Sequence, residues 1–216
     1  MKYLFVLSLF LIAPAASAFN PTTVVVDQPF EEILIPMGSE GQMQSYLGTL
    51  ETYPHLYEFI LEEPTTLEVR VRQRAEEVAG PVNLILLEVN PDTERISEII
   101  RLNTPVIERN RDFVGSLGIT VFESEWVAVE LDAGIYRLEV STPLNQSPYE
   151  LDFGRESVAN NYFGTFGTIW QVQRHFDYWW PRYLLSTYIL YQIGIIIIAF
   201  GIRHTWRQRK QITDAA

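Results

Sequence analysis

The stretch LDAGIYRLEVSTPLNQSPYELDF, Leu131 to Phe153, predicts the last hairpin of a small β-sandwich. Gly134 follows Asp132–Ala133, where a tight turn favours a residue that tolerates positive φ. Beyond the turn, a period of two puts apolar side chains on one face of each strand. These apolar positions are Tyr136, Leu138 and Val140 in the first run and Tyr149, Leu151 and Phe153 in the second.

Similar alternation recurs upstream, and no convincing helix of three turns interrupts residues 23–153. Strands with one apolar and one charged face, at a spacing of 8–12 residues, indicate antiparallel sheets packed face to face. The sequence therefore predicts an all-β sandwich. The expected strands are Thr23–Val26, Glu31–Ile35, Ser45–Glu51, His55–Glu62, Thr66–Arg72, Val82–Val89, Arg95–Arg101, Trp126–Leu131, Gly134–Ser141 and Pro148–Phe153.

Three segments of this region resemble the bacterial pre-peptidase C-terminal domain family. They are a strand carrying His55, Tyr57 and Phe59, the strand Asn83–Leu87, and the closing Leu-x-Ala-Gly-x-Tyr-x-Leu-x-Val hairpin at Leu131–Val140. The resemblance covers roughly residues 45–153, and the closing hairpin is its most specific part. It implies a jelly-roll-like antiparallel sandwich with an accessory role, and it implies no reaction. The sequence departs from the pattern at position 83, where such domains often have Asp, and over residues 102–125, which are longer and less regular.

The N-terminus has the three parts of a secretory signal peptide. Lys2 is followed by the apolar run YLFVLSLFLIA, which is too short to span a hydrocarbon core of about 30 Å. The small residues ASA at 16–18 predict cleavage before Phe19. We therefore expect a signal peptide at residues 1–18 and an exported domain at residues 19–154, with an uncleaved N-terminal anchor as the alternative.

The run YLLSTYILYQIGIIIIAFGI, Tyr183 to Ile202, contains 20 residues and no charge. At 1.5 Å per residue it covers about 30 Å as a helix, which matches the hydrocarbon core of a bilayer. Aromatic residues typical of membrane interfaces flank it, and so we expect a transmembrane helix at residues 183–202, with a buried globular helix as the alternative. The expected interface residues are Tyr178, Trp179, Trp180 and Trp206.

Basic residues follow the apolar run directly and predict its orientation. Because basic residues favour the cytoplasmic side, we expect a cytoplasmic tail at residues 203–216 and the sandwich on the other side of the cell (inner) membrane. A cleaved signal peptide predicts the same arrangement. The residues that carry this prediction are Arg203, Arg207, Arg209 and Lys210.

Small residues recur every seven positions in the predicted span, at Thr187, Gly194 and Gly201. They share one helix face, where small side chains allow close approach of another helix. Gln192 adds a polar group that prefers a hydrogen-bond partner over lipid. We expect another integral membrane protein, or a second copy of this chain, on the helix; an ordinary anchor tolerating these residues is the alternative.

Residues 155–182 form an aromatic juxtamembrane segment. Its apolar residues fit an amphipathic helix near Thr165–Tyr178, which lies on the outer leaflet or docks on a neighbour, and a plain linker is the alternative.

Charge and motif content narrow the classes of function. Residues 19–154 carry 24 acidic and eight basic side chains, a net charge of −16, which disfavours nucleic-acid binding. The chain has no Cys, three His and none of the common catalytic motifs, so we expect neither an enzyme nor a cofactor. Calcium on loop oxygens is the remaining cofactor alternative, although none of the acid pairs has the spacing of a calcium loop. Those pairs are Glu62–Glu63, Glu76–Glu77 and Asp92/Glu94.

Two functional interpretations remain open. The first is a membrane-anchored sandwich outside the cytoplasm that mediates protein–protein interaction as an accessory subunit of an envelope complex. The second is a tethered module for a glycan or another small ligand. Trp126 is the only tryptophan in the sandwich region and falls in an expected core strand, which argues against a sugar platform; exposed stacking by Trp126 would favour one.

Overall fold

The computed structural model describes residues 20–36, 42–75, 80–91, 93, 95–103, 110–155 and 162–214, apart from the side chains of residues 103, 110, 162, 163 and 209–214. The predicted signal peptide at residues 1–18 lies outside this description. The described strands are β1 (Thr22–Val24), β2 (Glu32–Leu34), β3 (Gln44–Glu51), β4 (His55–Leu61), β5 (Thr65–Arg74), β6 (Asn83–Val89), β7 (Ile96–Asn103), β8 (Asn110–Val114), β9 (Ile119–Glu123), β10 (Val127–Leu131), β11 (Gly134–Ser141) and β12 (Gln146–Phe153). They are followed by the helix α2 (Tyr162–His175), the 3₁₀-helix η1 (Trp180–Leu185) and the helix α3 (Thr187–Asp214).

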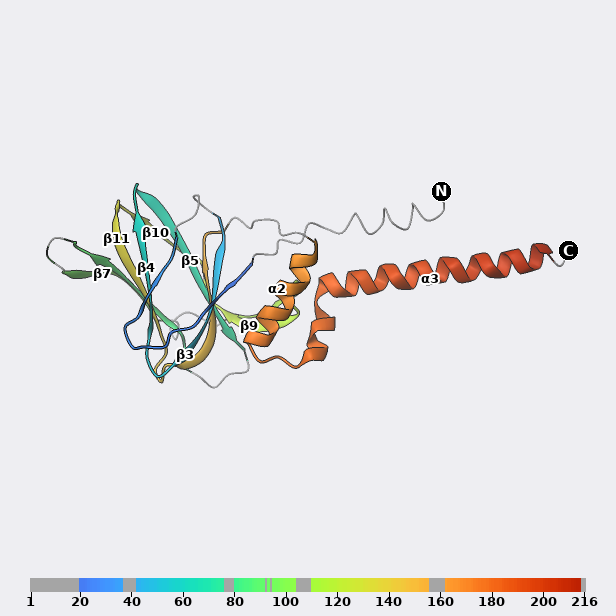
Figure 1. The fold of residues 1–216 in the computed structure, drawn as a ribbon, viewed down its shortest axis with the longest axis horizontal. Helices are drawn as coiled ribbons and strands as arrows, with labels where there is room; N and C mark the ends of the chain where they lie inside the picture. The colour runs from blue at the N-terminus through green and yellow to red at the C-terminus, as the bar shows by residue number, and fades with distance from the viewer. Residues whose placement is uncertain are drawn as a thin grey trace.

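The strands form two packed sheets, and a single long helix extends away from them (Figure 1). Sheet A has the order β1-β3-β12-β5-β9-β8, with β10 pairing on β5, and sheet B has the order β2-β4-β11-β6-β7. The expected all-β sandwich followed by a C-terminal apolar helix is confirmed. The strand pairs are antiparallel except for β1 on β3 and β2 on β4, where the short first strands pair parallel at one edge of each sheet.

The stretch Leu131–Phe153 does not form the predicted hairpin. β11 pairs with β4 and β6 in sheet B, whereas β12 pairs with β3 and β5 in sheet A, and β10 also belongs to sheet A. Each connection in this stretch therefore crosses from one sheet to the other. The apolar faces of β11 and β12 meet across the core instead of lying side by side in one sheet.

Tyr136 lies in this inter-sheet core, as its alternation predicts. Its ring stacks on Phe59, with centroids 5.7 Å apart, and its hydroxyl donates to the carbonyl of Asp132 at the rim, 2.9 Å away. Gly134 does not take the positive φ expected of it; positive φ occurs instead at Asn145, at 46°. The turn at Asp132–Gly134 therefore needs no positive φ at the glycine, and the Tyr136 hydroxyl bonds to its backbone.

Two strands occupy the irregular region 102–125, where none was expected. β8 and β9 form a hairpin at the edge of sheet A, joined by a turn at residues 115–118. Gly118 has a φ of 69°, so the turn needs a residue that tolerates the left-handed region. This hairpin turn reaches the helices that follow the sandwich.

The long helix begins at Thr187, four residues after the predicted start. Tyr183 and the two leucines after it belong to η1, and Ser186 is extended, with φ −60° and ψ 130°. The helix breaks there because Ser186 and Thr187 bond to the β8–β9 turn. The part that is long and apolar enough to cross a membrane runs from Thr187 to Gln208.

Candidate functional site

A second hydrophobic core joins the sandwich to its C-terminal helices. The outer face of sheet A presents Leu47, Ile119 and Val121, and α2 packs Val172 and Phe176 against this face, with all of these side chains buried. Figure 1 shows α2 between sheet A and the start of α3. The expected amphipathic helix is therefore present, and its apolar side docks on the protein's own sheet.

The turn between β8 and β9 is bonded to α2, to Ser186 between η1 and α3, and to the first residue of α3. Gln173 of α2 donates its amide to the Leu117 carbonyl at 2.6 Å, and the Ser186 hydroxyl donates to the Ser116 carbonyl at 2.6 Å. The backbone N–H of Thr187 donates to the Gly115 carbonyl at 2.8 Å. Gln173 and Ser186 are buried. We call residues 115–118 with Gln173, Ser186 and Thr187 the membrane junction.

Gly118 is the tightest point of the membrane junction. A Cβ at this position would lie 2.7 Å from the Ser186 backbone nitrogen, in addition to the strain from its positive φ. The close packing of the turn on Ser186 therefore leaves no room for a side chain at position 118. The sandwich and the apolar helix are held in one relative orientation.

Arg74 binds the C-terminal end of α2. Its guanidinium donates to the carbonyls of Phe176 and Asp177 at 3.1 and 3.2 Å, and it lies 4.8 Å from the centroid of the Tyr178 ring. A cation at a helix C-terminus pairs with the unsatisfied carbonyls and with the negative end of the helix dipole. Tyr178, predicted at the membrane interface, is buried in the second core and donates its hydroxyl to the Thr120 carbonyl.

A network of buried charges lies on the same outer face of sheet A. Arg72 of β5 bonds to Glu150 at 2.8 Å and to Asp152 at 2.7 Å, and Arg70 bonds to Asp152 at 2.8 Å and to Glu123 of β9. Glu150 and Asp152 are 0% exposed. Each of the three carboxylates contacts a guanidinium, and because only two guanidiniums are present, the network has a formal net charge of −1 when all of its members are ionised.

Burial sets the protonation of this network. Desolvation raises the pKa of Glu150 to about 7, against the attraction of Arg72. Among the described residues, the Oε1 atom of Glu150 has no hydrogen-bond partner. Burial alone would lower the pKa of Arg72, but Glu150, Asp152 and Glu123 outweigh it and hold that pKa above its ordinary value. We expect Glu150 to be the member of the network that takes up a proton first.

The charged face of β5 was expected to face solvent, so this network was missed at the level of the sequence. A signal for it exists, because Arg70, Arg72 and Arg74 alternate on β5 while Glu150 and Asp152 alternate on β12. If two such strands pair, their opposite charges lie next to one another and neutralise each other. The charged face can then be buried under another element of the fold. Only the pairing of β12 with β5 supplies that condition.

Two of the three histidines approach one tyrosine. The Nδ1 atom of His55 lies 2.7 Å from the Tyr149 hydroxyl, which is also 2.7 Å from the Tyr57 hydroxyl, and the Nε2 atom of His175 lies 3.1 Å from the Tyr149 carbonyl. Burial lowers the pKa of His55 to about 4, so its ring is neutral at pH 7. Among the described residues, no three His, Asp or Glu side chains are grouped to hold a metal ion, and the acid pairs beyond Glu62–Glu63 lie outside the description.

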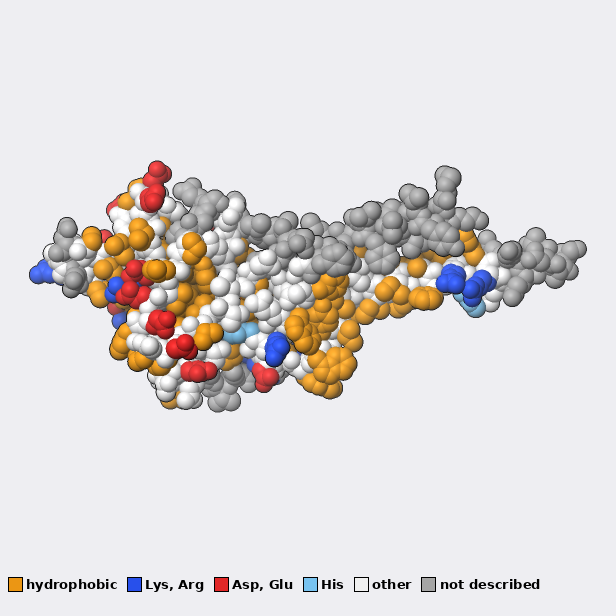
Figure 2. All heavy atoms as spheres, viewed as in Figure 1, with side chains coloured by type: hydrophobic (Ala, Val, Ile, Leu, Met, Phe, Trp, Pro, Cys, Tyr) orange, Lys and Arg blue, Asp and Glu red, His pale blue; other side chains and the backbone are white. Residues whose placement is uncertain are grey.

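Exposed apolar side chains gather where the sandwich meets the apolar helix. Trp179 is 75% exposed and Trp180 is 63% exposed, and they lie on or next to η1. Figure 2 shows hydrophobic side chains concentrated between the sandwich and α3 and continuing along α3. Trp206, Arg203 and Arg207 are exposed near the far end of this helix. Arg209 and Lys210 also belong to α3, but their side chains lie outside the description.

The predicted small-residue stripe and the polar residue of α3 occupy different faces. No described atom lies within 4 Å of a Cβ placed at Gly194 or Gly201, whereas Thr187 is engaged at the membrane junction. Gln192 is 7% exposed, and neither polar atom of its amide has a hydrogen-bond partner among the described residues. At 3.6 residues per turn, Gln192 points about 160° away from Gly194, so one helix cannot contact both.

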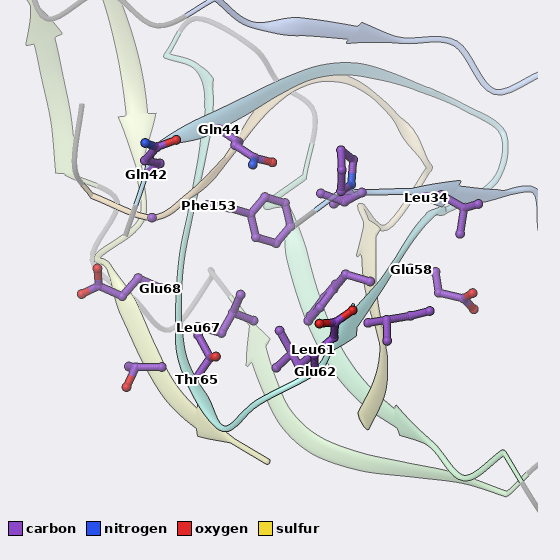
Figure 3. Close-up of a pocket in the computed structure, with 16 residues that line it drawn as sticks. Leu34, Gln42, Gln44, Glu58, Leu61, Glu62, Thr65, Leu67, Glu68 and Phe153 are labelled. Atoms are coloured by element: carbon purple, nitrogen blue, oxygen red, sulfur yellow. The ribbon is translucent and has the colours of Figure 1, made fainter. Parts of the chain in front are cut away.

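A pocket of about 620 Å³ opens at one end of the sandwich (Figure 3). Side chains of the inter-sheet core form its floor, among them Phe59, Leu61, Leu67 and Phe153. Figure 3 shows carboxylates and amides placed around this floor. No sequence pattern pointed to this pocket, because its lining comes from separate strands and their flanking loops: Leu34, Ile35, Pro36, Gln42, Gln44, Glu58, Phe59, Ile60, Leu61, Glu62, Thr65, Thr66, Leu67, Glu68, Phe153 and Gly154.

Trp126 does not offer an open aromatic face. It precedes β10 rather than lying in a core strand, and its side chain is half-buried. The guanidinium of Arg70 lies 4.4 Å from its ring centroid and that of Arg155 lies 5.5 Å away. A sugar that stacked on this ring would therefore have to compete with two guanidiniums.

No family model matches the chain, and no curated protein matches it either. Among solved structures, the fold is similar to the pre-peptidase C-terminal domain of a collagenase from Bacillus anthracis, with 14% identity, a TM-score of 0.35, and coverage of 60% of this chain and 98% of that one. It is also similar to CorA, a surface-associated copper-binding protein of Methylomicrobium album BG8, with 8% identity, a TM-score of 0.37, and coverage of 59% of this chain and 99% of that one. The Yersinia pseudotuberculosis-derived mitogen matches with 16% identity, a TM-score of 0.33, and coverage of 56% and 91%. These likenesses concern the fold and carry no argument about what the chain binds.

Proposed function

We propose that this protein is a non-enzymatic, single-pass membrane protein whose sandwich lies outside the cytoplasm and binds another protein, as an accessory subunit of an envelope complex. The membrane junction is the observation that carries the proposal. A simple tether needs no fixed geometry between a domain and its anchor. A subunit that offers one face to a membrane-bound partner does need it, because loss of orientational freedom before binding lowers the cost of association.

Residues at the two ends of α3 support the membrane assignment. Trp179 and Trp180 are exposed on the sandwich side, and Trp206 is exposed near the other end, as interfacial aromatic residues would be. Arg203 and Arg207 favour a cytoplasmic C-terminus. In this orientation, sheet A and α2 lie toward the membrane, and β7, at the far edge of sheet B, points away from it (Figure 1).

We propose another integral membrane protein, or a second copy of this chain, as the partner of α3. The open face at Gly194 and Gly201 allows close helix approach. Gln192, on the opposite side, is a polar amide within an apolar span and favours a hydrogen-bonding neighbour. We therefore expect a substitution on the glycine face and a substitution at Gln192 to disrupt different helix–helix contacts.

The test is chemical crosslinking of the full-length protein in native membranes, followed by affinity purification. Gly118→Ala should reduce the yield of the crosslinked partner severalfold, because the added Cβ disturbs the junction with Ser186. Gly194→Leu/Gly201→Leu should do the same if the partner lies on the open face. Ile193→Leu/Phe200→Leu changes side chains on a different face of the span and should leave the yield unchanged.

Each outcome bears on a different part of the proposal. Loss of the partner in Gly118→Ala, with the protein still in the membrane, supports a function that depends on fixed orientation. Recovery of wild-type protein as a lone monomer under all crosslinking conditions would overturn the proposal. Unchanged recovery in Gly194→Leu/Gly201→Leu would place the contact on the sandwich or on the Gln192 face.

A second candidate function is a tethered module for a small ligand. The pocket of about 620 Å³ favours it, because ligand pockets commonly measure about 300–1,000 Å³. A glycan is the less favoured ligand, since Arg70 and Arg155 lie over the ring of Trp126.

A further inference from the structure

The end pocket has the chemistry of a site for an aliphatic cation. Its floor is apolar, because Phe59 and Phe153 are 1% and 3% exposed and their ring centroids lie 6.2 Å apart. Leu34 and Ile60 line the pocket and are 71% and 59% exposed, so they form an apolar lip. A ligand that enters this pocket therefore meets hydrocarbon first and buries it against the floor.

The charges that line the pocket have one sign. Glu58, Glu62 and Glu68 contribute to the lining, and no Lys or Arg does. Figure 3 shows these three glutamates spread around the pocket, with Phe153 nearer its middle. The lining amides and hydroxyls, which are neutral, leave the acidic character unopposed within the pocket.

Nearby arginines do not neutralise the pocket. Arg137 bonds to Glu58 at 2.9 Å and also to Glu32, and Arg155 bonds to Glu68 at 2.9 Å. Of the three lining carboxylates, Glu58 and Glu68 therefore each contact a guanidinium, while Glu62 has no ion pair among the described residues, which leaves the pocket a formal net charge of −1. Residues 19–154 as a whole carry a net charge of −16, so the field of the domain also attracts cations.

We propose that this pocket binds a lysine or arginine side chain from an exposed segment of the protein partner. Such a side chain places its aliphatic stem on the apolar lip and floor and its charged end among the carboxylates, as long basic side chains do at surfaces. An anionic group is repelled by the same carboxylates. The proposal rests on the proposed function, because it assigns the chemistry of the partner to one site on the sandwich.

The test uses full-length protein in detergent micelles and synthetic pentapeptides, with isothermal titration calorimetry as the readout. The probe is acetyl-Ala-Leu-Lys-Leu-Ala-amide, and its matched controls carry norleucine or glutamate in place of lysine. We expect the lysine peptide to bind at least about tenfold more tightly than the norleucine peptide, which corresponds to about 1.4 kcal/mol. The glutamate peptide should bind more weakly than both.

Charge reversal in the pocket gives the decisive comparison. Glu62→Lys should weaken binding of the lysine peptide by at least about tenfold. Glu51→Lys makes the same charge change at an exposed position that does not line the pocket, at the opposite end of β3 from the lining residue Gln44, and it should change the affinity less than about twofold. Far-ultraviolet circular dichroism establishes that both variants remain folded.

Three results would overturn the proposal: equal affinity for the lysine and norleucine peptides, equal weakening by the two variants, or no binding of the lysine peptide at millimolar concentration. The proposed function would survive any of them if crosslinking still recovered a partner that Gly118→Ala loses. Conversely, peptide binding that depends on Glu62 in a protein without a crosslinked partner would support a tethered ligand module instead.

Discussion

The inter-sheet core and the second core bury apolar side chains in different surroundings. Between the sheets, side chains that alternate along β4, β5, β11 and β12 meet face to face in a largely apolar core. Between sheet A and α2, Leu47, Val121 and Phe176 pack beside the buried ions of Arg72, Glu150 and their partners. The first core depends mainly on hydrophobic burial and contains the buried hydrogen bonds of Tyr149 with His55 and Tyr57, while the second also depends on charge neutralisation.

This difference corresponds to a difference in role. The inter-sheet core makes the sandwich, and the second core attaches the apolar helix to it through α2 and the membrane junction. Buried ion networks are sensitive to loss of one member, because an unpaired charge in the interior costs several kcal/mol. We therefore expect changes in the first core to unfold the domain and changes in the second to release the helices first.

The largest effect should come from Phe59→Ala in the inter-sheet core. Phe59 is 1% exposed and packs on Tyr136 and Phe153, so its removal leaves a cavity and should lower the free energy of unfolding by about 4–5 kcal/mol. Denaturant titration of the full-length protein in detergent measures this loss. Ile60→Ala, at the neighbouring 59% exposed position, is the matched control. A loss below about 1 kcal/mol in Phe59→Ala would show that the core does not depend on this ring.

A smaller and more local effect should follow from Phe176→Ala in the second core. This side chain is 0% exposed, and its removal should destabilise the docking of α2 by about 3–4 kcal/mol. Because the inter-sheet core remains intact, hydrogen exchange should accelerate in α2 and in the β8–β9 turn before it does in β4 and β11. Uniform acceleration throughout the sandwich would mean that the two cores unfold together, and it would contradict the expectation that the helices are released first.

The smallest effect should be a pH dependence that Glu150 confers on the second core. Its pKa rises from an ordinary 4.5 to about 7 in the folded protein, so the folded state holds this proton more tightly than the unfolded state. The free energy of unfolding should therefore fall as pH rises from about 4.5 to 7, by an upper bound of about 3–4 kcal/mol at 1.4 kcal/mol per pKa unit. Glu150→Gln should remove this contribution.

His55 gives the wild type a second pH dependence, so the effect of Glu150 must be taken from the difference between the wild type and Glu150→Gln. The pKa of His55 is lowered from 6.5 to about 4, so this residue contributes stability that is lost as pH falls through this range, with the opposite sign to Glu150. Both proteins contain His55, and the difference between their stabilities across pH isolates Glu150. Glu130→Gln, at an exposed position, should follow the wild type. A wild-type curve parallel to that of Glu150→Gln would contradict the role assigned to the buried carboxylate.

The sequence predicted the strands and the long helix of this protein better than it predicted which strands pair with one another. Alternation at Tyr136, Leu138 and Val140 located a strand with one buried face, and the apolar run after Tyr183 located the long helix. Both predictions rest on local periodicity, which reports the burial that each side chain prefers. The hairpin assigned to Leu131–Phe153 failed because periodicity is the same whether two strands pair in one sheet or face each other across a core.

The candidate site was only partly visible in the sequence. Trp179, Trp180 and Trp206 are exposed, as expected of residues at the ends of a span, whereas Tyr178 lies in the second core because its hydroxyl and ring find partners there. The end pocket and the membrane junction combine residues far apart in the chain. Local patterns carry no information on such combinations.

The amino-acid sequence by itself determined most of the strands, the apolar helix and the apolar faces of both, because these follow from side-chain transfer free energies at fixed periods. The strands β8 and β9 did not show such a period and were not predicted. Only the tertiary structure decided which sheet each strand joined and where α3 began. It also decided that Arg72, Glu150 and Asp152 were buried, because that burial requires β12 to pair with β5 under a cover. The cost of removing these ions from water is offset only by neighbours that the folded chain brings together.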